Sequence, residues 1–230
     1  MPEPVRRRAL DLIAERVELA GKRIVDVGCG EGGLVRALVQ RGARVTGVEC
    51  GAEMLAAARA AEPAGDERYL EGVGQALPLP DGCADLVVFM NSLHHVPVPH
   101  MGAALAEAGR VLVPGGLALV NEPIADGAFF QLTRLVEDEV EVRAAALAAV
   151  RNACAAGLFT EQAEIVYLNP VRMESFEAFA ARMGRIDAAR KALVAEKAPL
   201  LRDLFHRLAE ARDGAFHFDQ PARLNILARA

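Results

Sequence analysis

The chain has 230 residues, with 26 basic and 31 acidic side chains that give a formal charge of −5 at pH 7. This length suits one large α/β domain or a core with an attached cap, and it excludes a repeat array and a mini-protein. The acidic balance offers no basis for binding nucleic-acid phosphates, so we expect no nucleic-acid partner. With 53% hydrophobic residues, the chain can bury a sizeable core.

Four cysteines occur, at Cys29, Cys50, Cys83 and Cys154. They are widely spaced and form no CxxC pair, which disfavours a disulfide framework or a zinc site. The first twenty residues carry acidic side chains and no apolar h-region, unlike a signal peptide. No uncharged apolar stretch of about 18 residues occurs either. We therefore expect a cytoplasmic protein with no membrane partner and no metal; the sequence does not indicate an oligomeric state.

Residues 22–122 alternate short apolar runs with helical stretches, as βαβ units do. Strands are predicted at 23–28, 44–49, 68–72, 85–91 and 117–122, and helices at 32–41, 52–61 and 100–111. The nearly continuous apolar runs are typical of parallel strands that are covered on both faces. We therefore predict a Rossmann-like, doubly wound α/β sheet whose ligand crevice lies at the carboxyl ends of the strands.

The residues after 122 have a different sequence pattern. Long helices are predicted at 133–156 and 187–212, with a strand at 164–168 between them and a final strand at 216–229, where Pro221 marks a bulge or an edge. No polar linker separates two domains, so we predict one domain over residues 1–230. Its core is predicted at about 21–122, 163–169 and 215–230, and a helical lid at about 1–20, 123–160 and 171–214.

The strongest motif is VDVGCGEGG, in which Gly28, Gly30 and Gly33 have the GxGxxG spacing of a strand-to-helix turn. Because glycines have no side chains, such a turn lets a ligand approach the backbone amides. The N-terminus of the following helix then favours a negatively charged group of that ligand. Dinucleotides, S-adenosylmethionine and purely structural turns all use this pattern. The loop alone therefore leaves the ligand open.

Two acidic residues near this loop reduce the number of ligands that it could bind. Glu49 ends the second predicted strand, where a carboxylate can accept both hydroxyls of a ribose and would repel a 2′-phosphate. Asp26 lies inside the apolar first strand, where a carboxylate is costly unless a partner satisfies it. An ammonium group is one such partner, and the methionine part of S-adenosylmethionine carries one. Hydrogen bonds from the loop amides are the alternative.

In these residues the chain resembles the class I S-adenosylmethionine-dependent methyltransferases. It is most similar to the branch that contains the ubiquinone and menaquinone biosynthesis enzymes. The resemblance covers about residues 22–123 and rests on four segments in the expected order: VDVGCGEGG, Glu49, QALPLPDGCADLVVFMNSLHHVP and RVLVPGGLALVNEP. It implies a seven-stranded sheet of order 3-2-1-4-5-7-6 with the last strand antiparallel. It also implies S-adenosylmethionine as cofactor and, for this branch, a small-molecule acceptor.

The resemblance assigns the cofactor contacts residue by residue. The positions around the methionine part are Asp26, Gly28, Cys29 and Gly30; the ribose acid is Glu49, with Cys50 beside the adenine; the adenine edge falls at Gly74 and Gln75; and Asn91 ends the fourth strand beside the ligand. One position departs from the pattern, because Val73 stands where many relatives have an aspartate that holds the adenine amino group. We interpret Cys29 as a small residue in a crowded turn, and the LPLP segment as a packed connector.

Methyl transfer from a sulfonium needs alignment in a shielded site, and a general base only when the acceptor carries a proton. Candidate catalytic residues are His94 and His95 after the fourth strand and Glu122 at the end of the fifth. Either histidine can serve as a base or as loop structure. Glu122 can take a proton or hold a substrate cation, or it is solvated or paired with the lid. The proline-rich spacing disfavours a metal site that adds His100.

Aromatic and methionine side chains of the lid can line an acceptor pocket, but the core of amphipathic helices is the favoured interpretation. They are Phe129, Phe130, Leu132, Phe159, Met173, Phe176, Phe179 and Met183. We predict a methyltransferase that acts on a small molecule. A non-catalytic regulator or partner subunit that binds S-adenosylmethionine is the alternative, favoured by Val73. The hypothesis that the chain is an NAD-dependent oxidoreductase is a second alternative, but it leaves Asp26 and the downstream segments unexplained.

Overall fold

The computed structural model describes residues 4–185 and 188–230, and the chain forms two compact units. The sheet unit comprises Ala9–Glu122, Val142–Ile165 and Arg223–Ala230. The helical unit comprises residues up to Arg8, Pro123–Glu141 and Val166–Ala222. Residues 1–3 of the predicted lid and Asp187, the predicted start of the last long helix, lie outside the described residues.

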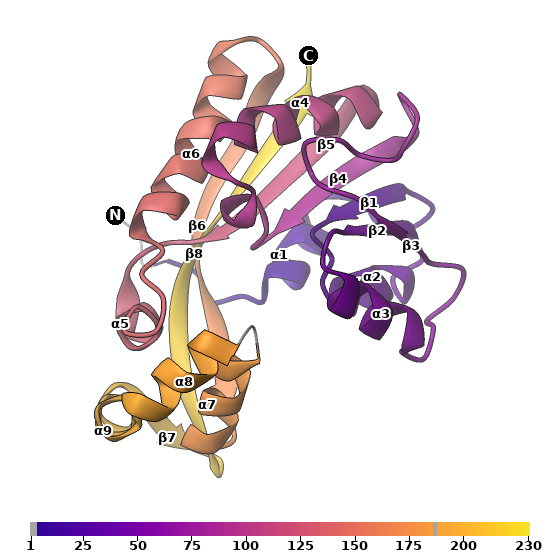
Figure 1. Ribbon diagram of the computed structural model, residues 1–230. Coiled ribbons are helices and arrows are strands. Elements are labelled where there is room, and N and C mark those ends of the chain that lie inside the picture. Colours follow the sequence, from indigo (N-terminus) through magenta and orange to yellow (C-terminus); the bar gives the residue numbers. More distant parts are fainter. Residues whose placement is uncertain (1–3, 186–187) are drawn as a thin grey trace. The chain divides into compact units, whose positions relative to one another are not determined.

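The sheet has the strand order β3-β2-β1-β4-β5-β8-β6, and β7 pairs with β8 (Figure 1). The strands are β1 (Arg23–Val27), β2 (Arg44–Glu49), β3 (Arg68–Glu71), β4 (Ala84–Met90), β5 (Leu112–Pro123), β6 (Phe159–Met173), β7 (Glu210–Arg212) and β8 (Ala215–Arg229). Strands β1 to β5 pair in parallel with their neighbours. The predicted mostly parallel Rossmann-like sheet, its order and its one antiparallel strand are confirmed, with β8 in the place of the predicted seventh strand.

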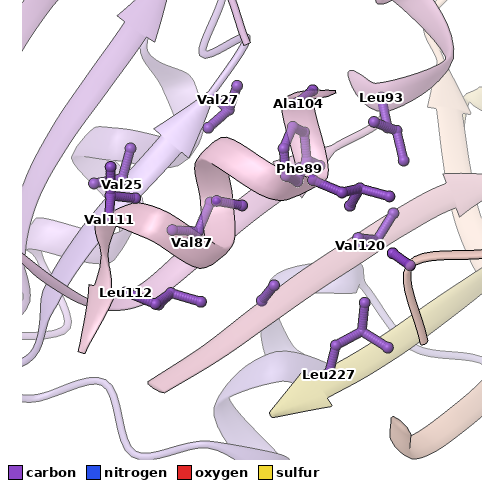
Figure 2. Close-up of a cluster of buried hydrophobic side chains, with 14 of the residues drawn as sticks. Val25, Val27, Val87, Phe89, Leu93, Ala104, Val111, Leu112, Val120 and Leu227 are labelled. Atoms are coloured by element: carbon purple, nitrogen blue, oxygen red, sulfur yellow. The ribbon is translucent and has the colours of Figure 1, made fainter. Parts of the chain in front are cut away.

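Helices pack on the sheet because its strands are apolar on both faces. The sheet unit contains α1 (Ala9–Arg16), α2 (Gly33–Val39), α3 (Ala52–Ala60), the short helices η1 (Leu93–His95) and η2 (Val98–His100), α4 (Met101–Val111) and most of α6 (Val140–Ala155). Figure 2 shows part of the core, where Val87 and Phe89 of β4 lie among side chains of α4, β5 and β8.

Part of the predicted lid belongs to this core instead. Ala146 and Val150 of α6 lie in the same buried cluster as Val87, and Leu12 and Ile13 of α1 are also buried. Both helices therefore cover hydrophobic surface in the sheet unit, which residues predicted only to cap a crevice would not do. That the helical unit acts as a lid stays a prediction.

The helical unit has its own core, built by α5 (Gly127–Thr133), α7 (Phe176–Gly184), α8 (Ala188–Glu196), α9 (Ala198–Leu208) and the adjoining parts of β6 and β8. Ring centroids of Phe129 and Phe218 are 5.4 Å apart, and those of Phe176 and Phe205 are 5.8 Å apart. Most of the aromatic side chains considered for an acceptor pocket are thus core residues, as the favoured interpretation predicts.

The predicted long helices are wrong in their extents. The helix predicted at 133–156 begins too early, because α5 ends at Thr133 and α6 begins only at Val140. The second is divided near Pro199, which lies in the first turn of α9, and it ends in a hairpin. Asp213 and Gly214 both have positive φ, which matches the Asp-Gly turn that joins two antiparallel strands. Within the described part of the chain, no helix has the length and apolar character needed to cross a membrane.

Candidate cofactor and active site

Every sequence-predicted site residue lies in the sheet unit. Asp26 is in β1, Glu49 ends β2, Asn91 directly follows β4, and Glu122 is the residue before the last in β5. Because parallel strands end at one edge of a sheet, β1, β2, β4 and β5 bring these positions to the same edge. This is the edge where open α/β sheets bind ligands.

The glycine loop is tightly packed at two of its glycines. A Cβ at Gly28, where φ is +73°, would lie 2.7 Å from the Cβ of Ser92, and a Cβ at Gly32, where φ is +75°, would lie within 2.8 Å of the Tyr69 ring. By contrast, Gly33 opens α2 with nothing within 4 Å of its Cβ position. The third glycine of the predicted motif is therefore replaced, in its structural role, by Gly32.

The backbone amides of this loop are used within the protein. The amides of Gly28 and Cys29 donate to the carbonyl of Val48, at 2.8 and 3.1 Å. The amide of Gly30 donates to Oε2 of Glu49 at 2.8 Å. These donors hold the loop against β2. The prediction that loop amides face a ligand is therefore wrong for the amides of Gly28, Cys29 and Gly30.

Asp26 is the unusual group of the site. The residue is only 1% exposed, and Oδ1 of its side chain has no hydrogen-bond partner among the residues that the structure describes. Burial, and to a lesser degree the charge of Glu49, raise the pKa of Asp26 to about 7. The alternative in which loop amides satisfy the carboxyl therefore does not apply to Oδ1. A cationic ligand group fits this position, because it would pair with the orphaned oxygen.

Glu49 is held in place by two backbone amides. Oε2 accepts from Gly30, and Oε1 accepts from Gly51 at 2.7 Å. The Cys50 side chain also hydrogen-bonds to this carboxylate, which has about four acceptor sites and so keeps room for a further donor; the Glu49 side chain is half-buried rather than covered. A pair of ribose hydroxyls fits this acceptor. Cys50 follows it and is exposed.

Cys29 is a packing residue. Its thiol is buried, and a Cβ at Gly47 would lie 2.7 Å from Sγ. Burial raises the pKa of Cys29 to about 12, with smaller contributions from the charges of Asp26 and Glu49. A thiol in this state is not a nucleophile at neutral pH, which agrees with its interpretation as a small residue in a crowded turn.

The predicted adenine contacts form a small turn. Val73 and Ala76 make an isolated bridge, with the Ala76 amide donating to the Val73 carbonyl at 3.1 Å, and Gly74 and Gln75 lie between them. A Cβ at Gly74 would lie 3.3 Å from the Val27 side chain, so the turn packs against the end of β1. Val73 is 38% exposed, which leaves an apolar surface where many relatives of the resembled family carry a carboxylate.

The connector after this turn is fastened by α4, through two residues that sequence reasoning missed. Arg110 donates from Nη1 to the Leu79 carbonyl at 2.8 Å and from Nη2 to the Leu77 carbonyl at 3.1 Å. Glu107 accepts from the Leu77 amide at 2.8 Å and also pairs with Arg110. The LPLP segment is thus a packed connector, as predicted. The spacing of Glu107 and Arg110, one turn apart on a helix, was the available signal.

The loop after β4 is fastened on both sides. Ser92, which sequence reasoning also missed, donates from Oγ to the carbonyl of Val27 at 2.5 Å. On the other side Glu122 accepts from the Leu93 amide at 2.9 Å and pairs with Nδ1 of His94. These bonds tie the loop to the ends of β1 and β5.

The three predicted catalytic residues differ in exposure. Glu122 is 2% exposed and His94 is 4% exposed, whereas His95 is exposed to solvent. The two imidazole centroids are 4.1 Å apart, with the ring planes at 46°. Of the alternatives for Glu122, the solvated one does not apply, because its carboxylate is buried and is bound by the Leu93 amide and the His94 ring. It orients the loop that carries both histidines.

Asn91 has a positive φ of 54°, which is uncommon for a residue other than glycine. Its amide donates to the Asn121 carbonyl at 2.8 Å, and its Oδ1 accepts from the Asn121 side chain at 3.1 Å. The turn therefore holds the exposed Asn91 at the end of β4. This placement agrees with a residue that lies beside a ligand.

Comparison with known proteins relates part of this chain to methyltransferases. Residues 25–120 match the family described as "Methyltransferase domain". The ubiquinone biosynthesis O-methyltransferase of Pseudomonas aeruginosa is 40% identical over 113 residues, which are 47% of either chain. The demethylmenaquinone methyltransferase of Thermus thermophilus is 43% identical over 130 residues, which are 54% of this chain and 57% of that one.

Among solved structures, the YcgJ protein of Bacillus subtilis has a TM-score of 0.65 at 22% identity, over 96% of this chain and 97% of that one. This likeness shows the fold. The chain spans about half the length of the curated relatives that it matches. Together with the fold and the motifs, these matches show that residues 25–120 are similar to class I S-adenosylmethionine-dependent methyltransferase domains. The likeness of residues 25–120 to this family implies S-adenosylmethionine as the cofactor.

Proposed function

We propose that the chain is a methyltransferase that transfers a methyl group from S-adenosylmethionine to a small-molecule acceptor. The observation that carries this proposal is the orphaned Oδ1 of Asp26, in an otherwise apolar strand end. Nicotinamide dinucleotides have no ammonium for this position, whereas the methionine part of S-adenosylmethionine does. The proposal therefore explains a buried carboxyl that the fold alone leaves unsatisfied.

Five positions would hold the cofactor. Asp26 would pair with its ammonium group, Glu49 would accept from its ribose hydroxyls, and Gly74 and Gln75 would border the adenine. The absence of a side chain at Gly30, where nothing lies within 4 Å of the Cβ position, leaves room at the turn after β1. The bound cofactor supplies an activated methyl group, so the protein's task is to align the acceptor and exclude water.

For an acceptor that carries a proton, we assign proton transfer to the histidine pair after β4. Glu122 is a positioning residue in this assignment, because both of its carboxylate oxygens are engaged by the loop that carries His94 and His95. His95 is exposed and is the candidate that contacts substrate. A histidine titrates near neutral pH, which suits the deprotonation of an acidic hydroxyl.

The acceptor class follows from the same chemistry. A relative matched over about half its length is called an O-methyltransferase of ubiquinone biosynthesis, and a hydroxyl acceptor that carries a proton requires a base such as the histidine pair offers. We therefore propose a small molecule with an acidic hydroxyl, such as a phenol. We also propose the cytoplasm as the compartment, because the four cysteines are free thiols and such thiols suit a reducing environment.

A product assay tests this proposal. The purified protein is incubated with S-adenosylmethionine and a panel of phenols, carboxylic acids and amines, and both S-adenosylhomocysteine and the methylated acceptor are measured. We expect both products with at least one phenol, a large loss in Asp26→Asn, and full activity in the exposed control Asp203→Asn. Cofactor binding without product for any acceptor would favour a non-catalytic protein that binds S-adenosylmethionine.

A further inference from the structure

A cavity of about 640 Å³ opens in the sheet unit at the amino ends of β1, β2 and β3. Its lining includes the first residue of each of these strands: Arg23, Arg44 and Arg68. The cofactor residues lie at the opposite ends of the same strands; from Arg44 to Glu49 the chain covers about 17 Å of strand. The cavity is therefore separate from the site described above, and the proposed function does not use it.

The arginines come close together because of the strand register. Arg44 lies directly opposite Arg23, and Arg68 pairs with Thr46, two residues further along β2. Adjacent strands are about 4.8 Å apart, so the three guanidinium groups start from neighbouring positions. Like charges on adjacent strands are unfavourable unless an anion lies between them.

Only one of these arginines is neutralised within the described part of the chain. Arg23 binds Asp85 through two guanidinium contacts, at 2.7 and 3.1 Å, and its amide donates to the same carboxylate at 2.8 Å. Arg44 and Arg68 are exposed and pair with no carboxylate of the described residues. Among the described residues, Asp66 is the only acidic one that lines the cavity, so the lining keeps a net positive charge.

We propose that this cavity binds an anionic small molecule through a phosphate group that Arg44 and Arg68 share. A guanidinium binds phosphate oxygens through two parallel hydrogen bonds, and a phosphate offers enough oxygens for two such groups. Val39, Val45 and Leu79 give the cavity apolar walls for the body of the ligand. The volume falls within the range of about 300–1,000 Å³ that small-molecule sites have.

The test is a titration of the full chain with inorganic pyrophosphate, followed by the backbone amide signals of Arg44, Arg68 and Asp66 in NMR spectra. We expect saturable shifts confined to this edge of the sheet unit. The double variant Arg44→Gln/Arg68→Gln should bind at least about tenfold more weakly. The matched control Arg8→Gln removes one exposed guanidinium elsewhere and should bind as the wild type does.

A further variant, a second affinity measurement and a second ligand complete the test. Arg44→Lys keeps the positive charge but loses the planar guanidinium group. Its affinity for pyrophosphate should lie between those of the wild type and the double variant. The affinity for S-adenosylmethionine should be unchanged in all variants, which separates this site from the proposed function and shows that the variants fold. Absent or non-saturable shifts, or equal binding in the double variant, would overturn the proposal, and equal binding of citrate would overturn the preference for phosphate.

Discussion

Replacing Asp26 by asparagine should have opposite effects on the ligand-free fold and on cofactor binding. Asparagine has the same shape but no charge, so the substitution removes the buried ionisation and keeps the packing. If Oδ1 is reserved for a ligand cation, the wild-type protein holds a carboxyl that is unfavourable until the ligand is bound. The stability of the free protein and the affinity for the cofactor then change in opposite directions.

The magnitude follows from the pKa of Asp26, which rises from 3.8 to about 7 on folding. Below pH 4 the carboxyl is protonated in both states. Between pH 4 and pH 7 the unfolded chain releases this proton while the folded chain keeps it, so stability falls as the pH rises. At 1.36 kcal/mol per pKa unit, the loss amounts to about 4 kcal/mol by pH 7 and changes little above it.

Thermal and denaturant unfolding of the ligand-free protein between pH 5 and pH 8 measures this effect. The wild type should lose stability over this range relative to Asp26→Asn, and the variant should be the more stable protein at pH 8. Asp85→Asn is the matched control with the opposite sign. Hydrogen bonds from Arg23 lower the pKa of Asp85 to about 2, so its carboxylate stabilises the fold above pH 4, and this variant should be less stable at pH 8.

Cofactor binding completes this test. Asp26→Asn should bind S-adenosylmethionine about 1.5–3 kcal/mol more weakly, as expected for a lost hydrogen bond to a charged group. In the wild type the affinity should fall about tenfold per pH unit below pH 7, because the carboxyl must first lose its proton. Identical pH profiles of stability in wild type and variant, or unchanged affinity in the variant, would refute this reasoning.

Three further predictions concern the rest of the site. Glu49→Ala should weaken S-adenosylmethionine binding by about 1–3 kcal/mol in calorimetry, and unchanged affinity in a folded variant would remove this residue from the site. Gly32→Ala should lower the free energy of unfolding by about 1–3 kcal/mol, since its positive φ and the nearby Tyr69 ring oppose a Cβ, whereas Gly33→Ala should be tolerated; equal effects in denaturant unfolding would contradict this assignment. For Glu122→Gln and His95→Ala, a product assay at saturating cofactor should show reduced turnover with cofactor affinity retained, and a shifted pH profile for Glu122→Gln. Normal turnover in both variants would leave catalysis to alignment alone.

The sequence predicts strands β1 to β4 well because its signals there are local and repeated, whereas β5 and β6 are longer than the predicted 117–122 and 164–168. The β2 strand has the predicted bounds, 44–49, and β1, β3 and β4 differ by a residue at their ends. Each is a short apolar run bounded by turn residues, a pattern that few other structures produce. The positions on the strands follow directly, which is why the sequence places Asp26 in the first strand and Glu49 at the end of the second.

The sequence predicts the helical segments less well because their pattern is ambiguous. Alanine-rich stretches favour helix throughout, so periodicity does not mark where α6 begins or where α8 ends. The Asp213–Gly214 turn was the available signal for the β7–β8 hairpin, but the preceding helical pattern obscures it. Contacts between distant segments, such as Ser92 against Gly28, have no local signal at all.

The most direct test of the central claim is a calorimetric titration of the purified protein at pH 8 with S-adenosylmethionine, S-adenosylhomocysteine and NADH in parallel. The structure predicts that the first two bind and NADH does not, because only they carry an ammonium group for Asp26. Asp26→Asn should weaken both of the ligands that bind. Binding of NADH, or of none of the three, would contradict the assignment of the β1–β2 edge as an S-adenosylmethionine site.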